Sequence, residues 1–253
     1  MVYIALFFLA LIVFLARFNF FRVPKKGVLV LLYHRVSNEK RPSGVGKFAV
    51  SPETFRWQLR FLKRMGYVSI LPEELESIVE SGLWKRKRFV IITFDDGYYD
   101  NLSAAEIMKN EGFRGIFFIS TAYIGSQLDG IQMMSAQQID MLLALGMRIG
   151  SHSHEHVKLS ALSDNEIKYQ VDQSLRILSA FCGVRDFAYP FGDYDSRVLK
   201  IVRSCGIERA YIIGQRIFDP QRDSSLEIPR AIVRSDTTKL DFYLLVTRGR
   251  SKF

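Results

Sequence analysis

Short strand-like runs alternate with stretches of helical periodicity along most of this 253-residue chain. Apolar runs bounded by polar or glycine-bearing turns indicate buried strands, and hydrophobic residues that recur every three to four positions indicate helices. The pattern predicts strands at 28–33, 89–93, 115–120, 147–151, 186–189, 209–213 and 228–233. It predicts helices at 52–65, 72–81, 99–112, 135–145, 163–181, 195–205 and 239–247. Such alternation favours an α/β fold with a parallel sheet or barrel.

Local signals support several of the predicted helix starts. Ser163 and Glu166 have the spacing of a capping box. Pro52 and Pro72 stand at helix starts, where proline is tolerated because the first N–H groups have no partner within the helix. With 48% hydrophobic residues, the chain is large enough for one barrel-sized core.

The first residues form a separate apolar segment. Val2 to Ala16 is an unbroken hydrophobic run, which is short for a membrane span of ~20 residues unless it extends to Phe21 with Arg17 snorkelling. No basic residue precedes the run and no Ala-x-Ala site follows it, so it makes a poor cleavable signal peptide. We expect an uncleaved single-pass membrane anchor over residues 1–22, contacting membrane lipid, and one domain over 23–253.

The positive charges bear on orientation and on partners. Arg17, Arg22, Lys25 and Lys26 all follow the apolar run, and the positive-inside rule would then leave the domain in the cytoplasm. The net charge is +9, and 85–88 is a block of four basic residues. We interpret this charge as solvated surface with affinity for anionic lipid headgroups. No nucleic acid is expected as a partner, because no recognition motif accompanies the charge.

Two neighbouring carboxylates, Asp95 and Asp96, end the apolar run Phe89–Ile92. Successive side chains of a strand point to opposite faces, so both carboxylates would not normally serve one site. Gly97 begins a loop at this point, which allows the alternation to break and both side chains to turn into one cleft. The alternative is a solvated turn or a cap for the helix that follows.

Three of the four histidines lie within five residues, at positions 152, 154 and 156. Together with one carboxylate, two imidazoles can hold a divalent ion and leave a position open for water. A second carboxylate could then act as a base on that water. His152 and His156 are the pair we favour, although His154 could replace either of them. The residues therefore predict a hydrolytic metal site.

Four motifs resemble those of the polysaccharide deacetylases, carbohydrate esterase family 4, also called the NodB-homology domain. They are Thr93–Gly97, the His-Ser-x-x-His of 152–156, Phe187–Gly192 and the Leu-Tyr-His-Arg-Val of 32–36. The last is similar to the opening of the branch that includes poly-N-acetylglucosamine deacetylases. The resemblance spans about residues 28 to 235. It implies a distorted (β/α) barrel, preceded here by one apolar helix, and a metal-dependent N-deacetylase that hydrolyses a linear amide, usually with zinc.

The resemblance also implies a role for each residue that matches a family motif. Asp95 would be the general base, and Asp96, His152 and His156 would be the metal ligands. In the third motif, the backbone N–H of Phe191 would help to bind the oxyanion. Tyr189 and Phe191 are accordingly expected on the oxyanion and substrate side of the site.

The chain departs from the family pattern at two places. Ala188 stands where the third motif commonly begins with arginine, and no histidine follows His156 to supply the acid of the fifth motif. In the branch with a Tyr-His opening, the acid histidine comes from the N-terminal side, which would make His34 the acid. Arg230 could take over the orientation of Asp95. The alternative for His34 is a structural residue that caps the first strand.

We therefore expect a hydrolase that removes N-acetyl groups from the amino sugars of a polysaccharide or glycan. One alternative is a deacetylase or deformylase of a lipid-linked amino sugar at the cytoplasmic membrane face. Another is a membrane-anchored glycan-binding domain without catalysis, which the missing fifth-motif histidine would favour. Most relatives act on exported polysaccharide, whereas the charges after the apolar run favour the cytoplasm, so both membrane faces stay open.

Overall fold

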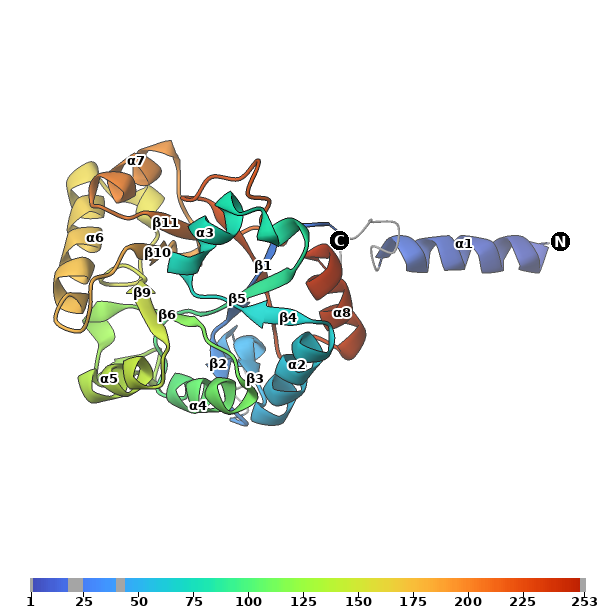
Figure 1. The fold of residues 1–253 in the computed structure, drawn as a ribbon, viewed down its shortest axis with the longest axis horizontal. Coiled ribbons are helices and arrows are strands. Elements are labelled where there is room, and N and C mark those ends of the chain that lie inside the picture. Colours follow the sequence, from blue (N-terminus) through green and yellow to red (C-terminus); the bar gives the residue numbers. More distant parts are fainter. Residues whose placement is uncertain (1, 18–24, 40–43, 251–253) are drawn as a thin grey trace.

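The computed structural model describes residues 2–17, 25–39 and 44–250. Within these ranges seven parallel strands close into a barrel that helices surround (Figure 1). In spatial order they are β1 (Val28–Tyr33), β12 (Ile228–Ile232), β11 (Arg209–Ile213), β10 (Asp186–Ala188), β9 (Arg148–Ser151), β6 (Ile116–Ile119) and β5 (Arg88–Phe94). β1 and β5 close the barrel, with Val28 opposite Phe89 and Tyr33 opposite Phe94.

The barrel is distorted along β5. Its first half pairs with a short additional strand, β4 (Tyr67–Ser69), and its second half pairs with β6 on the same side. Two short pairs lie outside the barrel: β2 (Arg35–Val36) with β3 (Ala49–Val50), and β7 (Gln127–Leu128) with β8 (Ile131–Gln132). The expected distorted (β/α) barrel is confirmed.

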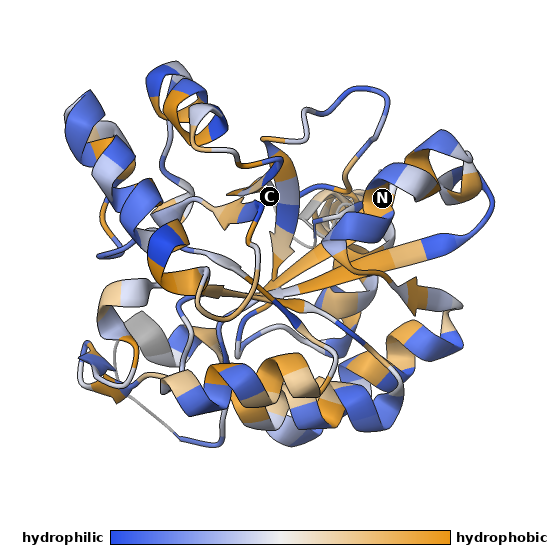
Figure 2. Ribbon diagram, turned by 60° about the vertical axis from the view of Figure 1, so that its left-hand side comes forward, coloured by the Kyte–Doolittle hydropathy of each residue, from blue (hydrophilic) through white to orange (hydrophobic). Residues whose placement is uncertain are grey.

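Helices cover the outside of the barrel and turn their apolar stripes toward the strands (Figure 2). They are α2 (Pro52–Arg64), α3 (Leu75–Glu80), α4 (Asn101–Glu111), α5 (Ala136–Ala144), α6 (Asp164–Leu178), α7 (Ser196–Ser204) and α8 (Lys239–Arg248). The capping box expected before α6 is present, because the Ser163 N–H donates to Glu166 Oε2 over 2.8 Å.

Alternate residues of each strand divide between two apolar layers. Leu31, Ile92 and Phe94 pack outward against the helices, whereas Val30 and Ile91 join Phe118 and Tyr211 in a second cluster of buried residues. The second set lies inside the barrel, since side chains alternate along a strand. The same alternation places Thr93 and Asp95 on the inner side of β5. The barrel interior therefore leads to Asp95.

The predicted strands all form, with end points that differ by a residue or two at most. The expected helix at 72–81 is instead a 3₁₀ turn, Pro72–Glu74, followed by the shorter α3. β4 was not predicted. It has only three residues and no apolar run, and its pairing with β5 is a tertiary contact.

The N-terminal segment forms one helix, α1 (Val2–Arg17), whose large apolar side chains are exposed. Residues 18–22 of the expected anchor lie outside the described residues. Among the described helices, none combines the length and hydropathy that a membrane crossing requires.

Candidate active site

The predicted site residues gather at the carboxyl ends of the barrel strands. His34 follows β1 directly, Asp95 and Asp96 follow β5, and His152 follows β9. Parallel strands of a barrel all end at the same rim, so residues far apart in sequence meet there. This rim is where enzymes with barrel folds carry their active sites.

Asp96, His152 and His156 form the one cluster of potential metal ligands found among the described residues, with all ligand atoms within 4.8 Å of one another. Asp96 Oδ1 lies 3.3 Å from His152 Nε2 and 3.2 Å from His156 Nε2. That oxygen is buried, and the two imidazole nitrogens are the groups that face it. One carboxylate and two imidazoles converging on one point form a ligand set that suits a divalent ion such as zinc.

The charges in this cluster favour an ionised carboxylate. Burial alone raises the pKa of Asp96, but the hydrogen-bonding imidazoles of His152 and His156 bring its pKa well below the ordinary value. For His152, burial lowers the pKa, and the nearby carboxylates of Asp95 and Asp96 outweigh burial and raise it. An anionic carboxylate that faces two imidazole nitrogens is ready to bind a cation.

Strained backbone shapes the same rim. Asp96, Ser153, His156 and Phe191 all have positive φ angles, of 74°, 63°, 52° and 60°. Aspartate and histidine tolerate this left-handed region better than most residues, but phenylalanine rarely occupies it. Conformations of this kind persist where the surroundings hold them, and they cluster at functional sites. The backbone N–H of His156 is held by Ser153 Oγ over 3.1 Å.

The tautomer of His152 follows from its second nitrogen. Its Nδ1 lies 2.7 Å from the backbone carbonyl oxygen of Ala188, so Nδ1 carries a proton and its N–H donates a hydrogen bond to that oxygen. In the neutral ring the lone pair of Nε2 would then be available to a cation that Asp96 also binds. Hydrogen bonds of this kind orient metal-binding histidines. Ala188, where the family commonly has arginine, thus contributes through its main chain.

Arg230 reaches from β12 across the barrel interior to Asp95. The two side chains form a bidentate pair, with Nη1 to Oδ1 at 2.6 Å and Nη2 to Oδ2 at 2.8 Å, and Arg230 is fully buried. Burial alone raises the pKa of Asp95, but the charge of Arg230 outweighs it and leaves the pKa below its ordinary value. The guanidinium missing at position 188 is therefore supplied from another strand, in the place that the sequence indicated for Arg230.

Replacing Arg230 by lysine should reduce turnover roughly 10- to 100-fold while metal content stays at the wild-type level. Lysine keeps the charge but cannot hold both carboxylate oxygens, so Asp95 loses its orientation. Arg209→Lys is the matched control. Arg209 forms the same bidentate pair with Asp186, at the opposite end of the barrel. Steady-state rates and zinc analysis of both variants test this; equal activity losses would mean that only folding is affected.

His34 lies within the electrostatic reach of the site. Its Nδ1 is buried without a hydrogen-bond partner, and its ring packs on Phe48 with 4.6 Å between centroids. Burial lowers the pKa of His34, and the carboxylates of Asp96 and Asp95 oppose that shift only in part. A lowered pKa makes the imidazolium a stronger acid and leaves a smaller protonated fraction at neutral pH. Its role as acid stays a prediction.

The remaining predicted residues differ in whether their side chains face the ligand cluster. Phe191 lies at the cluster, with its half-exposed ring 4.6 Å from the ring of His156. The side chain of Tyr189 instead points into the core, where its hydroxyl donates to the Leu226 carbonyl over 3.2 Å. This geometry gives Tyr189 a packing role and argues against a side-chain contact with substrate. His154 Nδ1 hydrogen-bonds to Thr121 Oγ1, away from the ligand pair.

Two supporting residues were not predicted from the sequence. Tyr98 is buried, and burial together with its hydrogen bond to Asp96 raises its pKa above the ordinary value. Asn101 donates from Nδ2 to the backbone oxygen of His34 over 2.7 Å and so fixes that residue. The position of Tyr98 directly after Gly97 was a signal, but its contact with Asp96 depends on the left-handed turn.

A model of the polysaccharide deacetylase family matches residues 71–210, more than half of the chain. The chain therefore belongs to this family. It is 26% identical over 236 residues to the poly-β-1,6-N-acetyl-D-glucosamine N-deacetylase of Staphylococcus epidermidis, covering 86% of this chain and 78% of that protein.

Other relatives differ more in length. A polysaccharide deacetylase of Bacillus subtilis is 24% identical over 182 residues, and the match covers 71% of this chain but only 62% of that protein. Among solved structures, IcaB from Ammonifex degensii is 23% identical with a TM-score of 0.77, covering 91% of this chain and all of that one. This likeness supports the fold.

Proposed function

We propose that the protein is a metal-dependent hydrolase that removes N-acetyl groups from amino sugars in a polysaccharide or other glycan. The observation that carries this proposal is the convergence of Asp96, His152 and His156 beside the Asp95–Arg230 pair. Family membership supports it, as does the N-deacetylase named among the relatives. The reaction is hydrolysis of a linear amide, which gives an amine and acetate.

Asp96, His152 and His156 would hold the metal, and zinc suits this ligand set. A bound ion of this kind supplies a Lewis acid that polarises an amide carbonyl and acidifies water. Asp95 is ionised and fixed by Arg230, so it is placed to accept the proton of the attacking water. The backbone N–H of Phe191, in its left-handed turn beside His156, is the proposed donor to the oxyanion.

An acid must protonate the departing amine, because an amide does not expel an unprotonated nitrogen anion at neutral pH. His34 is the histidine that remains near the carboxylates once His152 and His156 are assigned as ligands. We assign the acid role to its imidazolium.

His34→Ala should lower kcat by roughly 10²-fold or more and leave metal content unchanged. In the wild type, turnover should fall at high pH because His34 loses its proton. This alkaline limb of the pH–rate profile should disappear in the variant. His154→Ala serves as the control for loss of a nearby histidine. Near wild-type turnover with an unchanged profile in His34→Ala would return this residue to a structural role.

The direct test of function is acetate release from N-acetylated chito-oligosaccharides, with chelated protein and protein reloaded with zinc. Activity that disappears on chelation and returns with zinc is the expected result. A lipid-linked amino sugar, assayed in parallel, separates the two substrate classes. Metal binding without acetate or formate release from either substrate would instead support a glycan-binding domain without catalysis.

We further propose that α1 anchors the protein to a membrane, given its exposed apolar side chains. A chain that begins at Lys25 should stay soluble and retain its hydrolase activity, because β1 starts at Val28. The full-length protein should sediment with membranes and resist extraction by high salt, since a buried apolar segment holds more tightly than surface charge. Membrane fractionation of both forms measures this, and extraction by salt alone would contradict insertion.

A further inference from the structure

The end of the barrel opposite the candidate active site carries a groove of about 310 Å³ whose charged lining residues are all basic. Its charged residues are Lys25, Lys26, Lys85, Arg86, Lys87 and Arg88, and we call this the basic groove. The lysine pair precedes β1 and the block of four runs into β5, so the barrel brings together two segments about sixty residues apart. The block alone was visible in the sequence; the groove is a product of the fold.

The charge of the basic groove is not neutralised within the described part of the chain. All six residues are exposed, and none forms an ion pair with a described carboxylate. Arg88 donates to the Met65 carbonyl, and the Lys85 ammonium lies 5.3 Å from the ring centre of Trp84. Six like charges held this close repel one another and favour an anionic partner.

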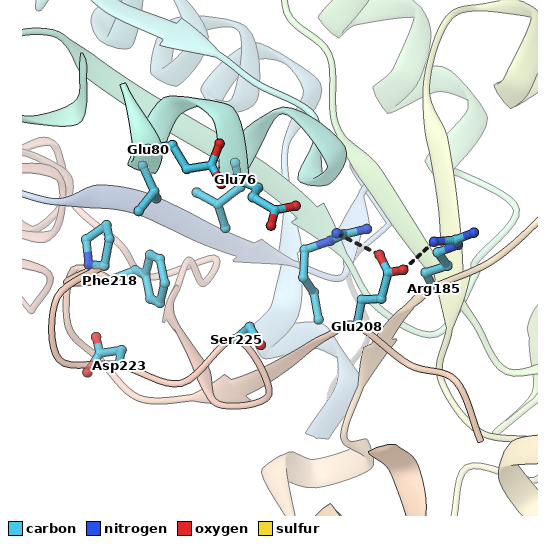
Figure 3. Close-up of a pocket in the computed structure, with 11 residues that line it drawn as sticks. Glu76, Glu80, Arg185, Glu208, Phe218, Asp223 and Ser225 are labelled. Atoms are coloured by element: carbon cyan, nitrogen blue, oxygen red, sulfur yellow. Dashed lines mark hydrogen bonds and ion pairs between the residues drawn. The ribbon is translucent and has the colours of Figure 1, made fainter. Parts of the chain in front are cut away.

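A second cavity at the same end of the barrel has the opposite character (Figure 3). Its volume is about 650 Å³, and its lining includes Glu76, Glu80, Glu208 and Asp223. Its arginines are already paired: Arg209 with Asp186, and Arg185 with Glu208. The N-terminal end of the barrel is therefore basic near the start of β1, β4 and β5. It is acidic near the start of β10 and β11.

The apolar helix α1 supplies a second observation that points to lipid. It has sixteen residues without an acidic side chain, and its Phe7 and Phe8 are more than half exposed. Seven residues separate Arg17 from Lys25, and the eight Cα–Cα steps between them span at most about 29 Å even in a fully extended chain. An exposed apolar helix is thus tethered next to the basic groove, which is the composition expected of a segment that meets an anionic bilayer.

We infer that the N-terminal end of the barrel docks on an anionic lipid bilayer through the basic groove, with phospholipid headgroups as its ligands. The basic half faces the bilayer and the acidic half tilts away from it. Arg88 begins β5 and Asp96 lies just beyond its end, eight residues further on, so the catalytic rim stands roughly 20–25 Å from the docked end.

This orientation bears on substrate, and that part rests on the proposed function. With its rim held away from the bilayer, the docked enzyme faces glycan chains that extend outward. An amino sugar attached directly to a lipid would stay at the membrane surface, too far from Asp95 to react. Docking therefore favours a polymer as substrate over a short lipid-linked sugar.

The test compares Lys85→Gln/Lys87→Gln with a matched control, Lys109→Gln/Lys200→Gln, in the full-length chain. The control residues are exposed lysines on α4 and α7, without an ion pair among the described residues, and both variants remove two charges. On phosphatidylcholine vesicles containing phosphatidylglycerol, the groove variant should partition roughly 10- to 30-fold more weakly than the control at low salt. On pure phosphatidylcholine the two should match.

If α1 alone binds the protein to vesicles with and without phosphatidylglycerol, quenching of tryptophan fluorescence by lipid is a second readout. The chain has two tryptophans, and Trp84 lines the basic groove while Trp57 lies on α2. In a Trp57→Phe background, brominated lipid should quench the fluorescence of Trp84 when phosphatidylglycerol is present. The substitutions Lys85→Gln/Lys87→Gln should abolish this quenching. In a Trp84→Phe background, Trp57 should stay unquenched.

The outcomes separate docking from catalysis. The groove variant should retain the wild-type rate on soluble chito-oligosaccharides, and failure of the wild type there counts against the proposed function alone. Equal partition and equal Trp84 quenching in the groove variant and the control would overturn docking. Displacement by inorganic phosphate beyond that by chloride of equal ionic strength would also overturn it, because the groove would then bind a free anion.

Discussion

Asp95→Asn should lower kcat by roughly 10²- to 10⁴-fold while zinc stays bound. Asparagine keeps the shape of the side chain, but its amide cannot accept the proton of the attacking water. The substitution leaves the proposed metal ligands untouched, since Asp96 Oδ1 is the carboxylate oxygen that faces both imidazoles. Single-turnover rates on an N-acetylated oligosaccharide, with metal analysis of the same sample, measure both effects.

The substitution also leaves Arg230 buried without its counter-charge, so a loss of stability must be separated from a loss of chemistry. Removal of one partner from a buried ion pair costs about 3–5 kcal/mol. Asp186→Asn is the control, because it breaks another bidentate pair, a partly buried one with Arg209, at the far end of the barrel. Both variants should lose stability in thermal unfolding, and only Asp95→Asn should lose turnover.

Asp96→Asn distinguishes the two neighbouring carboxylates. Asparagine tolerates the left-handed backbone at this position, where φ is 74°, so the turn should survive. The variant loses the anionic ligand and should bind zinc more weakly. If Asp96→Asn kept its metal and Asp95→Asn lost it, the two assignments would have to be exchanged.

His156→Ala should abolish stoichiometric zinc binding, and activity with it. Two protein ligands would remain in place of three, and structural or catalytic zinc sites in proteins rarely hold with fewer than three. His152→Ala should behave in the same way and also frees the Ala188 carbonyl. Isothermal titration of chelated protein with zinc measures the affinity directly.

His154→Ala provides the comparison for the metal site. It lies between the two ligands in sequence, but its Nδ1 is engaged with Thr121 Oγ1. Its zinc affinity should equal that of the wild type within experimental error. Loss of binding in this variant, with full binding in His152→Ala, would refute the ligand set.

Much of the fold was readable from local pattern. The seven barrel strands are largely buried, and the short, mainly apolar runs that form them fixed their positions to within a residue or two. Short elements were not predicted, as β4 illustrates. A strand of three residues has no detectable periodicity, and it forms because it pairs with β5. At 72–81 the helical periodicity, with Pro72 at its start, predicted one helix where the structure has a 3₁₀ turn and a shorter helix.

The sequence by itself determined the alternation of strand and helix and singled out Asp95, Asp96, His152 and His156 as candidate site residues. These are short-range properties: hydrophobic period, turn residues and the spacing of ionisable side chains. They also determined which family the chain resembles, because its motifs are contiguous.

Only the tertiary structure decided how those residues are used. Closure of the barrel brings Arg230 onto Asp95 across 135 positions of sequence, and the Ala188 carbonyl onto His152. It turns the side chain of Tyr189 into the core, and it joins Lys25 and Lys26 to the block at 85–88. Contacts between distant segments depend on strand order and register, which local patterns do not encode, and so the partners of each site residue appear only when the barrel closes.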